Sequence, residues 1–204
     1  MKNSHQVEFY FDCSSPWTYL AFIEILPLSQ RLGIEIIWKP ILVGGVFNNV
    51  NQDVYEFRSK PNQLKLSYAN NDLALWSKIR GIEITFPKVF PVNSVKAMRG
   101  CLFAVQEEKL EIFARSVFQS YWGEGIDISQ EDCLLQIAKN SGLNPDEFKK
   151  FISSQDAKDL LLKNTDELID RGGFGSPTFF YKEHMFFGND RTNLLEEAIN
   201  QNLI

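Results

Sequence analysis

The chain has 204 residues, of which 44% are hydrophobic and 23% are charged, so it can bury a core as an ordinary globular protein. Its formal net charge is −5 and it has no basic block, which argues against nucleic acid as a partner. The apolar runs are too short for a secretory signal or a membrane span, and the three cysteines form no CxxC or metal-ligand pattern. We therefore expect a cytoplasmic protein without membrane contact.

The first quarter of the chain predicts a strand, a helix and a second strand. Pro16 suits the first turn of the helix because its missing N–H is not needed there, and Pro27 predicts a kink. The expected elements are a strand at 7–11, a helix at 16–32, a strand at 34–38, and a loop at Gly44, Gly45 and the asparagine-rich residues 48–52.

The middle of the chain has helical periodicity from about residue 61 to about residue 171. Within it, Ser129 and Asp132 form a capping-box-like helix start, and residues 140–145 indicate a helix stop followed by a restart. After this helical block we expect strands at 178–181 and 184–187 and a closing helix at 191–201.

The segment FYFDCSSPWTYL, which begins at Phe9, is the most informative about function. It places Ser15 at a helix N-terminus, where free N–H groups and the positive end of the helix dipole favour an anion. The simpler alternative is that Ser14 or Ser15 is only a helix N-cap. Cys13 could serve as a thiol, although a lone cysteine at a strand end is more often a small buried apolar residue, the interpretation we favour.

A second segment, residues 172–191, adds weight to the functional interpretation of Ser15. It is rich in glycine and leads through Ser176 and Pro177 into a strand, a short turn and another strand. An X-Pro bond at the entry to a strand is a candidate cis peptide.

Together the two segments resemble the thioredoxin superfamily, in which a strand–CxxC–helix motif faces a cis-proline loop. Residues 15–18, Ser-Pro-Trp-Thr, stand where such proteins have Cys-x-x-Cys, and Pro177 matches the cis-proline. Disulfide exchange needs one sulfur to attack and one to resolve, so we do not expect that chemistry here. The resemblance implies an α/β, thioredoxin-like fold with a large all-helical insertion. The implied division is a thioredoxin-like domain at 1–52 and 172–204 and an insertion domain at 53–171.

Over nearly its whole length the chain resembles, more narrowly, the 2-hydroxychromene-2-carboxylate isomerase family, whose close relatives are the kappa-class glutathione transferases. The segments behind this resemblance are FYFDxxSP from Phe9, WKPIL from Trp38, FPVNSVKAMR from Phe90, YWGEGIDIS from Tyr121, GFGxPT from Gly173 and FGNDR from Phe187. The resemblance implies glutathione as cofactor. It also implies a small aromatic substrate, 2-hydroxychromene-2-carboxylate, which reversible thiol addition converts to trans-o-hydroxybenzylidenepyruvate. Two alternatives stay open: a kappa-like glutathione transferase or peroxidase, and a thioredoxin-like protein that binds thiols without turnover.

The same resemblance implies the site residues and a homodimer. Ser15 is implied as the catalytic residue that faces the glutathione sulfur. The implied glutathione-binding residues are Ser15, Lys65, Asp72, Ser176, Pro177, Asn189 and Asp190, and the implied substrate-side residues are Lys39, Asn93, Arg99 and Trp122.

Among the substrate-side residues Asn93 ranks first, because a buried amide is a good donor to an oxyanion. Arg99 could equally be a structural ion-pair partner. The helix around Lys65 could equally be a solvated face, and Leu66 stands there in place of the family's usual glycine.

Overall fold

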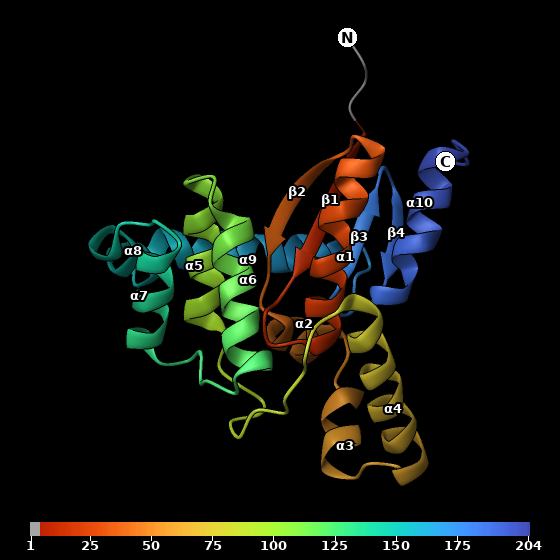
Figure 1. Ribbon diagram of the computed structural model, residues 1–204, viewed down its shortest axis with the longest axis horizontal. Coiled ribbons are helices and arrows are strands. Elements are labelled where there is room, and N and C mark those ends of the chain that lie inside the picture. Colours follow the sequence, from red (N-terminus) through yellow and green to blue (C-terminus); the bar gives the residue numbers. More distant parts are fainter. Residues whose placement is uncertain (1–4) are drawn as a thin grey trace.

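The computed structural model describes residues 5–204, whose strands form one mixed sheet with the order β2-β1-β3-β4 (Figure 1). The strands are β1 (Gln6–Phe11), β2 (Glu35–Pro40), β3 (Thr178–Tyr181) and β4 (His184–Phe187). β1 is parallel to β2 and antiparallel to β3, with Tyr10 opposite Thr178. The end of β1 therefore lies beside the start of β3, and this register brings the Ser15 and Pro177 segments together.

Alternation along the strands gives the sheet two apolar faces, which different helices cover. The helices are α1 (Pro16–Leu32), α2 (Val43–Val50), α3 (Asp53–Ser59), α4 (Gln63–Arg80), α5 (Val95–Gln106), α6 (Leu110–Phe118), α7 (Glu131–Asn140), α8 (Pro145–Ile152), α9 (Gln155–Asp170) and α10 (Thr192–Asn200). Phe9, Phe11 and Phe179 pack on the side of α1 and α10. Tyr10 and Phe180 pack on the opposite side, where α9 crosses behind the sheet in Figure 1.

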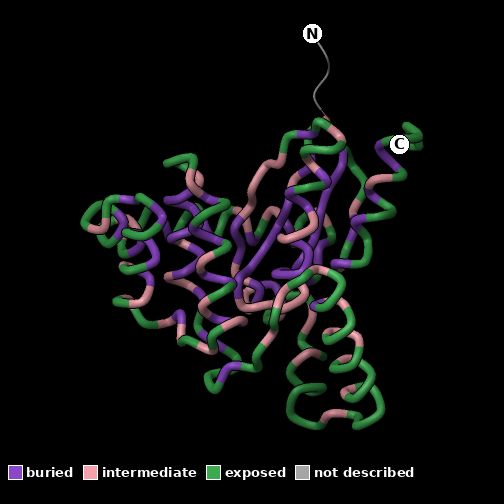
Figure 2. Tube along the Cα trace, in the orientation of Figure 1, coloured by how far each residue is buried: buried purple, intermediate pink, exposed green. Residues whose placement is uncertain are grey.

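The remaining helices form two groups. Helices α5 to α8 pack beside the β2 edge and share the main core with the sheet, whereas α3 and α4 project from the body as an arm (Figure 1). Figure 2 shows that most of this arm is exposed. Its upper end is held to α1 by an ion pair in which Arg80 lies 2.6 Å from Glu24. None of the helices in residues 5–204 is long and apolar enough to cross a membrane.

Several local predictions are confirmed. Helix α1 has the expected bounds, 16–32, and continues through Pro27, and strands β3 and β4 also have their expected bounds. The helix stop and restart is confirmed, because α7 ends at Asn140 and Asn144 caps the start of α8. The peptide bond between Ser176 and Pro177 is cis. The division into domains at residues 52 and 171 stays a prediction.

The loop predicted at Gly44, Gly45 and 48–52 is wrong except at residues 51 and 52, because residues 43–50 form α2. Helix propensity alone argues against a helix that contains two adjacent glycines, and tertiary contacts override it here. The N–H of Val43 donates to the Asp12 carboxylate at 2.9 Å, and Val46 packs in the apolar cluster under α9. The first turn is therefore held by groups far away in the sequence.

The predicted helical block is also interrupted. Residues 82–94 form an irregular loop that contains Pro87 and Pro91, and proline disfavours helix at and before its own position. The Thr85 N–H in this loop donates to the carbonyl of Trp122 at 2.6 Å. The capping box at Ser129 is wrong as well, because α7 begins after Gln130 and the Ser129 N–H donates to Asp127.

Candidate active site

Ser15 caps α1 and also reaches the cis-proline loop. Its Oγ accepts the N–H of Thr18 at 3.2 Å, so Ser15 and not Ser14 is the N-cap of α1, which leaves open whether it has a further role. The same hydroxyl lies 3.3 Å from the carbonyl oxygen of Ser176, to which it donates. The side chain is half-buried, so the hydroxyl lies at a helix N-terminus within reach of a ligand.

The side chain of Ser176 ties the two halves of the site together. Its Oγ accepts the backbone N–H of Asp12 at 3.1 Å and lies 2.8 Å from the Thr18 hydroxyl. Ser176 is buried, and the cis peptide to Pro177 follows directly. These contacts hold the carbonyl of Ser176 opposite the Ser15 hydroxyl.

Asp12, which the sequence analysis did not select, is the buried carboxyl beneath this turn. One oxygen accepts the N–H of Ser14 at 2.9 Å, and the other accepts the N–H of Val43 at 2.9 Å and the hydroxyl of Ser94 at 3.1 Å. Burial raises the pKa of the Asp12 carboxyl, and hydrogen bonds from these groups oppose the rise. Asp12 thus joins the Ser15 turn to α2 and to the 82–94 loop. The sequence feature that could have identified Asp12 is its position as a charged residue directly after an apolar strand.

Trp122 and Cys13 form the inner wall of the turn. The indole Nε1 of Trp122 donates to the carbonyl of Cys13 at 2.9 Å, and the Cys13 N–H donates to the sulfur of Met98 at 3.3 Å. Cys13 is fully buried, and burial, followed by the neighbouring Cys101, raises the pKa of its thiol. The prediction of a small buried residue is confirmed, and this thiol is poorly suited to act as a nucleophile.

Asn93 lies close to the turn but is exposed, so the expectation of a buried amide is wrong. Its Oδ1 accepts the N–H of Val95 at 3.1 Å. The next residue, Ser94, is bonded to Asp12, which holds the Asn93 backbone beside the Ser15 turn.

The segment Asn189–Arg191 forms a 3₁₀ turn beside the cis-proline, because the N–H of Gly188 donates to the carbonyl of Pro177 at 3.0 Å. The Asn189 side chain is buried, and its Nδ2 has no hydrogen-bond partner within residues 5–204. Asp190 is exposed and pairs with Arg191 at 2.8 Å. The turn therefore offers an unused buried donor and an accessible carboxylate.

The structure does not bring Lys39 or Arg99 to the Ser15 turn. The Lys39 ammonium lies on the α9 side of the sheet, 3.0 Å from both carboxylate oxygens of Glu167. Arg99 donates to the carbonyl of Ile152 at 3.0 Å, in α8. Its partner is a backbone group and not the carboxylate that the structural alternative expected.

Lys65 and Asp72 both lie on α4, in the exposed arm. Lys65 is exposed in the first turn of α4, and Asp72 is half-buried. Neither side chain has an ion pair with another group in the described part of the chain.

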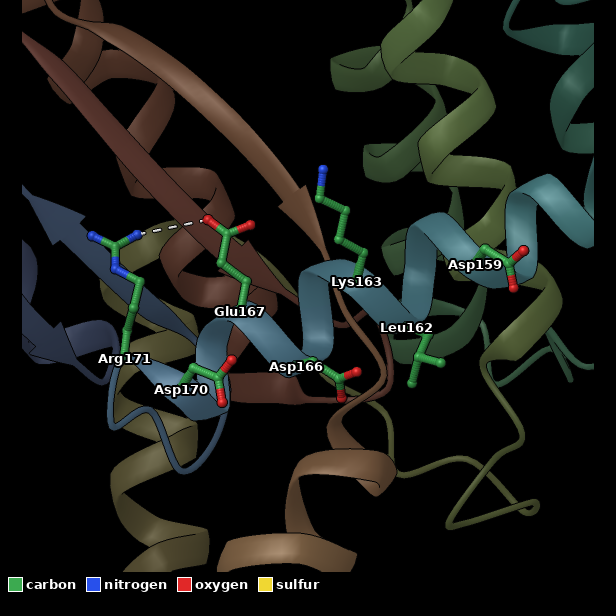
Figure 3. A pocket seen from close by; sticks show the side chains of 7 residues that line it. All are labelled: Asp159, Leu162, Lys163, Asp166, Glu167, Asp170 and Arg171. Carbon is green, nitrogen blue, oxygen red and sulfur yellow. Dashed lines mark ion pairs between the residues drawn. The ribbon is translucent and has the colours of Figure 1, made fainter.

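A separate pocket lies along α9 (Figure 3). Its lining, all from α9 and the residue after it, is Asp159, Leu162, Lys163, Asp166, Glu167, Asp170 and Arg171. Figure 3 shows Glu167 turned toward Arg171, and the two groups lie 3.9 Å apart. Neither Ser15 nor any residue of the cis-proline peptide lines this pocket, so we do not assign it to the active site.

Comparison with known proteins agrees with this geometry. Residues 6–200 match the model of the DSBA-like thioredoxin domain. The chain is 32% identical to 2-hydroxychromene-2-carboxylate isomerase of Pseudomonas putida, over 95% of this chain and 93% of that protein. It is 28% identical to human glutathione S-transferase kappa 1, over 96% and 91% of the two chains. A solved 2-hydroxychromene-2-carboxylate isomerase superposes with a TM-score of 0.82 at 31% identity, covering 97% of this chain and 96% of that one.

The fold and the family match thus define a DSBA-like thioredoxin protein, in which Ser15 caps α1 opposite the cis-proline loop. Within this class, the chain belongs to the family of the 2-hydroxychromene-2-carboxylate isomerases. Both the thioredoxin-like fold and the family resemblance expected from the sequence are confirmed.

Proposed function

We propose that this protein is a glutathione-dependent isomerase that converts 2-hydroxychromene-2-carboxylate-type substrates to trans-o-hydroxybenzylidenepyruvate. The observation that carries the proposal is the position of the Ser15 hydroxyl, at the N-terminus of α1 and 3.3 Å from the carbonyl of Ser176. Relatives named for this isomerase share about a third of the sequence over nearly the whole chain, which supports an isomerase.

The residues around the cis-proline loop fit glutathione. An unpartnered buried donor costs about 1–3 kcal/mol, so the free Nδ2 of Asn189 favours an acceptor such as a carboxylate of the tripeptide. Asp190, exposed beside it, suits the ammonium of the same γ-glutamyl end. Ser176 and Pro177 border the tripeptide's path, and Lys65 would meet the glycyl carboxylate. The set contains a separate partner for each charged end of the ligand.

Bound glutathione would supply a thiolate that adds reversibly to the double bond beside the substrate's ketone, so that this bond can rotate. The chain's own task is to stabilise negative charge. The Ser15 hydroxyl can turn from the Ser176 carbonyl and donate to a thiolate, and the free N–H groups at the start of α1 act in the same direction. The exposed Nδ2 of Asn93 can donate to an oxygen of the substrate on which negative charge develops.

We also propose that the protein is a homodimer in which the arm contacts a second copy. Helix α4 exposes Leu64, Tyr68, Leu75 and Ile79, which at about 100° per residue share one stripe of the helix. Soluble monomers rarely leave such a stripe uncovered, and Asp72 lies on the same helix. Light scattering after size exclusion should give twice the mass of one chain, and Leu75→Glu should shift it toward the monomer. A wild-type monomer would refute this.

We further propose a reducing, cytoplasmic compartment. Cys13, Cys101 and Cys133 are free thiols, and disulfide-stabilised secreted proteins rarely leave all their cysteines free. Fractionation of source cells tests this directly, because recovery in a secreted or periplasmic fraction would contradict it.

The decisive test of the main proposal is isomerisation of 2-hydroxychromene-2-carboxylate, followed by absorbance with and without glutathione. We expect turnover that requires glutathione. Glutathione binding without turnover would instead favour a kappa-like transferase or peroxidase, which a screen of electrophiles and peroxides would identify. If glutathione neither binds nor supports turnover, the non-catalytic thioredoxin-like alternative replaces the proposal.

A further inference from the structure

Arg58, on α3 of the arm, is a cation held between aromatic rings and not by carboxylates. Its guanidinium carbon lies 5.6 Å from the ring centre of Phe47 and 5.3 Å from that of Phe90. Within residues 5–204 it has no ion pair. Cation–π contacts use no N–H group, so the planar fork of donors stays available to an anion. No local sequence pattern marks Arg58, because the two rings come from other parts of the chain.

The two rings connect Arg58 to both halves of the active site. Phe90 packs edge-on against Trp122, with 6.1 Å between ring centres, and the Trp122 indole donates to the carbonyl of Cys13 in the Ser15 turn. Phe47 lies beside Gly175, where an added Cβ would come 3.9 Å from its ring, and Ser176 follows directly. Arg58 is therefore linked through Phe90 to the 82–94 loop and through Phe47 to the cis-proline loop.

Tyr121, whose ring centre lies 4.8 Å from that of Trp122, is subject to the charge of Arg58 as well. Burial raises the pKa of Tyr121, the negative charges of Asp127 and Asp12 raise it further, and the positive charge of Arg58 lowers it. The Tyr121 hydroxyl donates to the carbonyl of Val89 at 2.8 Å, and the charges of Asp12 and Arg58 act on its pKa with opposite sign. Both charges act over the same small region.

Exposed rings next to Arg58 can take the apolar part of a ligand. Phe86 and Phe90 are 59% and 37% exposed, their ring centres are 5.0 Å apart, and both pack against Trp122. Exposed large apolar groups that border a free cation suit a ligand that is flat and apolar on one side and anionic on the other.

We propose that Arg58 binds the carboxylate of the aromatic substrate while Phe86 and Phe90 contact its ring. This assignment rests on the proposed isomerase function. A guanidinium flanked by rings presents two parallel N–H groups to a carboxylate, a geometry that lysine cannot supply. Of the cations that the resemblance assigned to the substrate side, Lys39 is paired with Glu167. Arg99 donates to the carbonyl of Ile152 in α8, and its buried Nε has no partner within residues 5–204. Arg58 positions the substrate and does not take part in proton transfer.

The test compares Arg58→Gln and Arg58→Lys with Lys60→Gln, which removes an exposed positive charge two residues away. The readouts are kcat and KM for isomerisation, and the Kd of trans-2-hydroxycinnamate, a flat aromatic carboxylate, by calorimetry without glutathione. For Arg58→Gln we expect KM and Kd to rise at least about tenfold, with kcat nearly unchanged. In Arg58→Lys, KM and Kd should rise less, and in Lys60→Gln both should equal the wild-type values.

The calorimetric arm separates this proposal from the isomerase assignment. Equal Kd and KM in wild type and Arg58→Gln would overturn the role of Arg58 while leaving the isomerase intact. Equal losses in Lys60→Gln and Arg58→Gln would also overturn it, because they would indicate long-range charge and not a contact. If the wild type does not isomerise the substrate but still binds 2-hydroxycinnamate through Arg58, the isomerase proposal fails and the carboxylate site stands.

Discussion

The Ser15 turn and the ion cluster under α9 both adjoin β1, yet they use their polar groups differently. The ion cluster consists of Glu8, Tyr10, Lys39, Glu167 and Arg171. Its charges are matched at short distances: the Tyr10 hydroxyl donates to Glu167 at 2.7 Å, and Arg171 lies 2.6 Å from Glu8. Each charged group of the cluster has an opposite charge within 3.9 Å, and these ion pairs fasten α9 to the sheet.

At the Ser15 turn, in contrast, some polar groups can still form hydrogen bonds to a ligand. The Ser15 hydroxyl is half-buried and held by a long bond of 3.3 Å, and the Nδ2 of Asn189 has no partner within residues 5–204. A high density of charged groups therefore does not mark the active site in this protein. Donors with spare capacity at a helix N-terminus are the better marker, because buried polar groups are normally satisfied.

The largest effect is expected from Ser15→Ala. Loss of one donor to developing negative charge lowers kcat by about 10²–10³-fold in comparable sites, and we expect a loss of this size in the isomerisation assay. Ser14→Ala is the matched control, because its backbone N–H and not its hydroxyl makes the bond to Asp12. Circular dichroism would check that loss of the N-cap leaves the fold intact. Wild-type turnover in Ser15→Ala would remove Ser15 from the mechanism.

A smaller effect is expected from Asp190→Ala, which removes the carboxylate offered to the glutathione ammonium. We expect the Kd of glutathione, measured by calorimetry, to rise about tenfold, since a charge-assisted hydrogen bond is worth about 1.5–3 kcal/mol. Glu183→Ala, at an exposed carboxylate in the β3–β4 turn, is the control. An unaltered Kd in Asp190→Ala would exclude this carboxylate from the binding site.

The sequence was most informative where structure is decided locally. Helix α1 starts where Ser15 and Pro16 provide a cap and a suitable first residue, and it ends at Gly33, whose positive φ of 64° suits glycine. These signals lie within a few residues of the boundary that they set. The cis-proline loop was predictable for the same reason, because an X-Pro bond and a following apolar strand are visible together.

What the sequence could not supply was the partner of each polar group. Glu167, the partner of Lys39, follows 128 residues later, so nothing near Lys39 in the sequence contradicted the substrate-side role that the family resemblance implied. Helix α2 depends on Asp12, and the rings around Arg58 come from α2 and the 82–94 loop. Such pairings exist only after the chain has folded, which is why both Asp12 and Arg58 were missed.

The ion cluster itself gives a pH-dependent prediction. Partial burial tends to raise the pKa of Glu167, but hydrogen bonds from Tyr10 and Lys39 outweigh this and hold it below the ordinary value of 4.5. A carboxyl with a lowered pKa stabilises the folded state above its ordinary pKa, and this contribution is lost as the pH falls through the lowered value. Glu167→Gln should therefore lower the free energy of unfolding by about 1 kcal/mol at pH 7, and the difference from wild type should shrink below the ordinary pKa.

Urea unfolding at several pH values measures this, with Asp166→Asn as the control on the same helix. Asp166 is exposed, so its variant should differ little from wild type at any pH. A Glu167→Gln deficit that stays constant down to acid pH would show that the lost contribution is packing and not charge.

The smallest effect, and the sharpest test of the comparison, concerns Lys39 and Asn93, which the family resemblance assigned to the same substrate pocket. Lys39→Gln should lower stability by less than about 1 kcal/mol and leave kcat and KM unchanged, because the ammonium serves only the ion cluster. Asn93→Ser keeps an oxygen for the N–H of Val95 and removes the amide donor, so it should lower kcat without a loss of stability. If instead Lys39→Gln impairs catalysis and Asn93→Ser does not, the ion cluster on the α9 side contributes to the reaction. Unsatisfied hydrogen-bond donors would then be the wrong criterion for locating the active site.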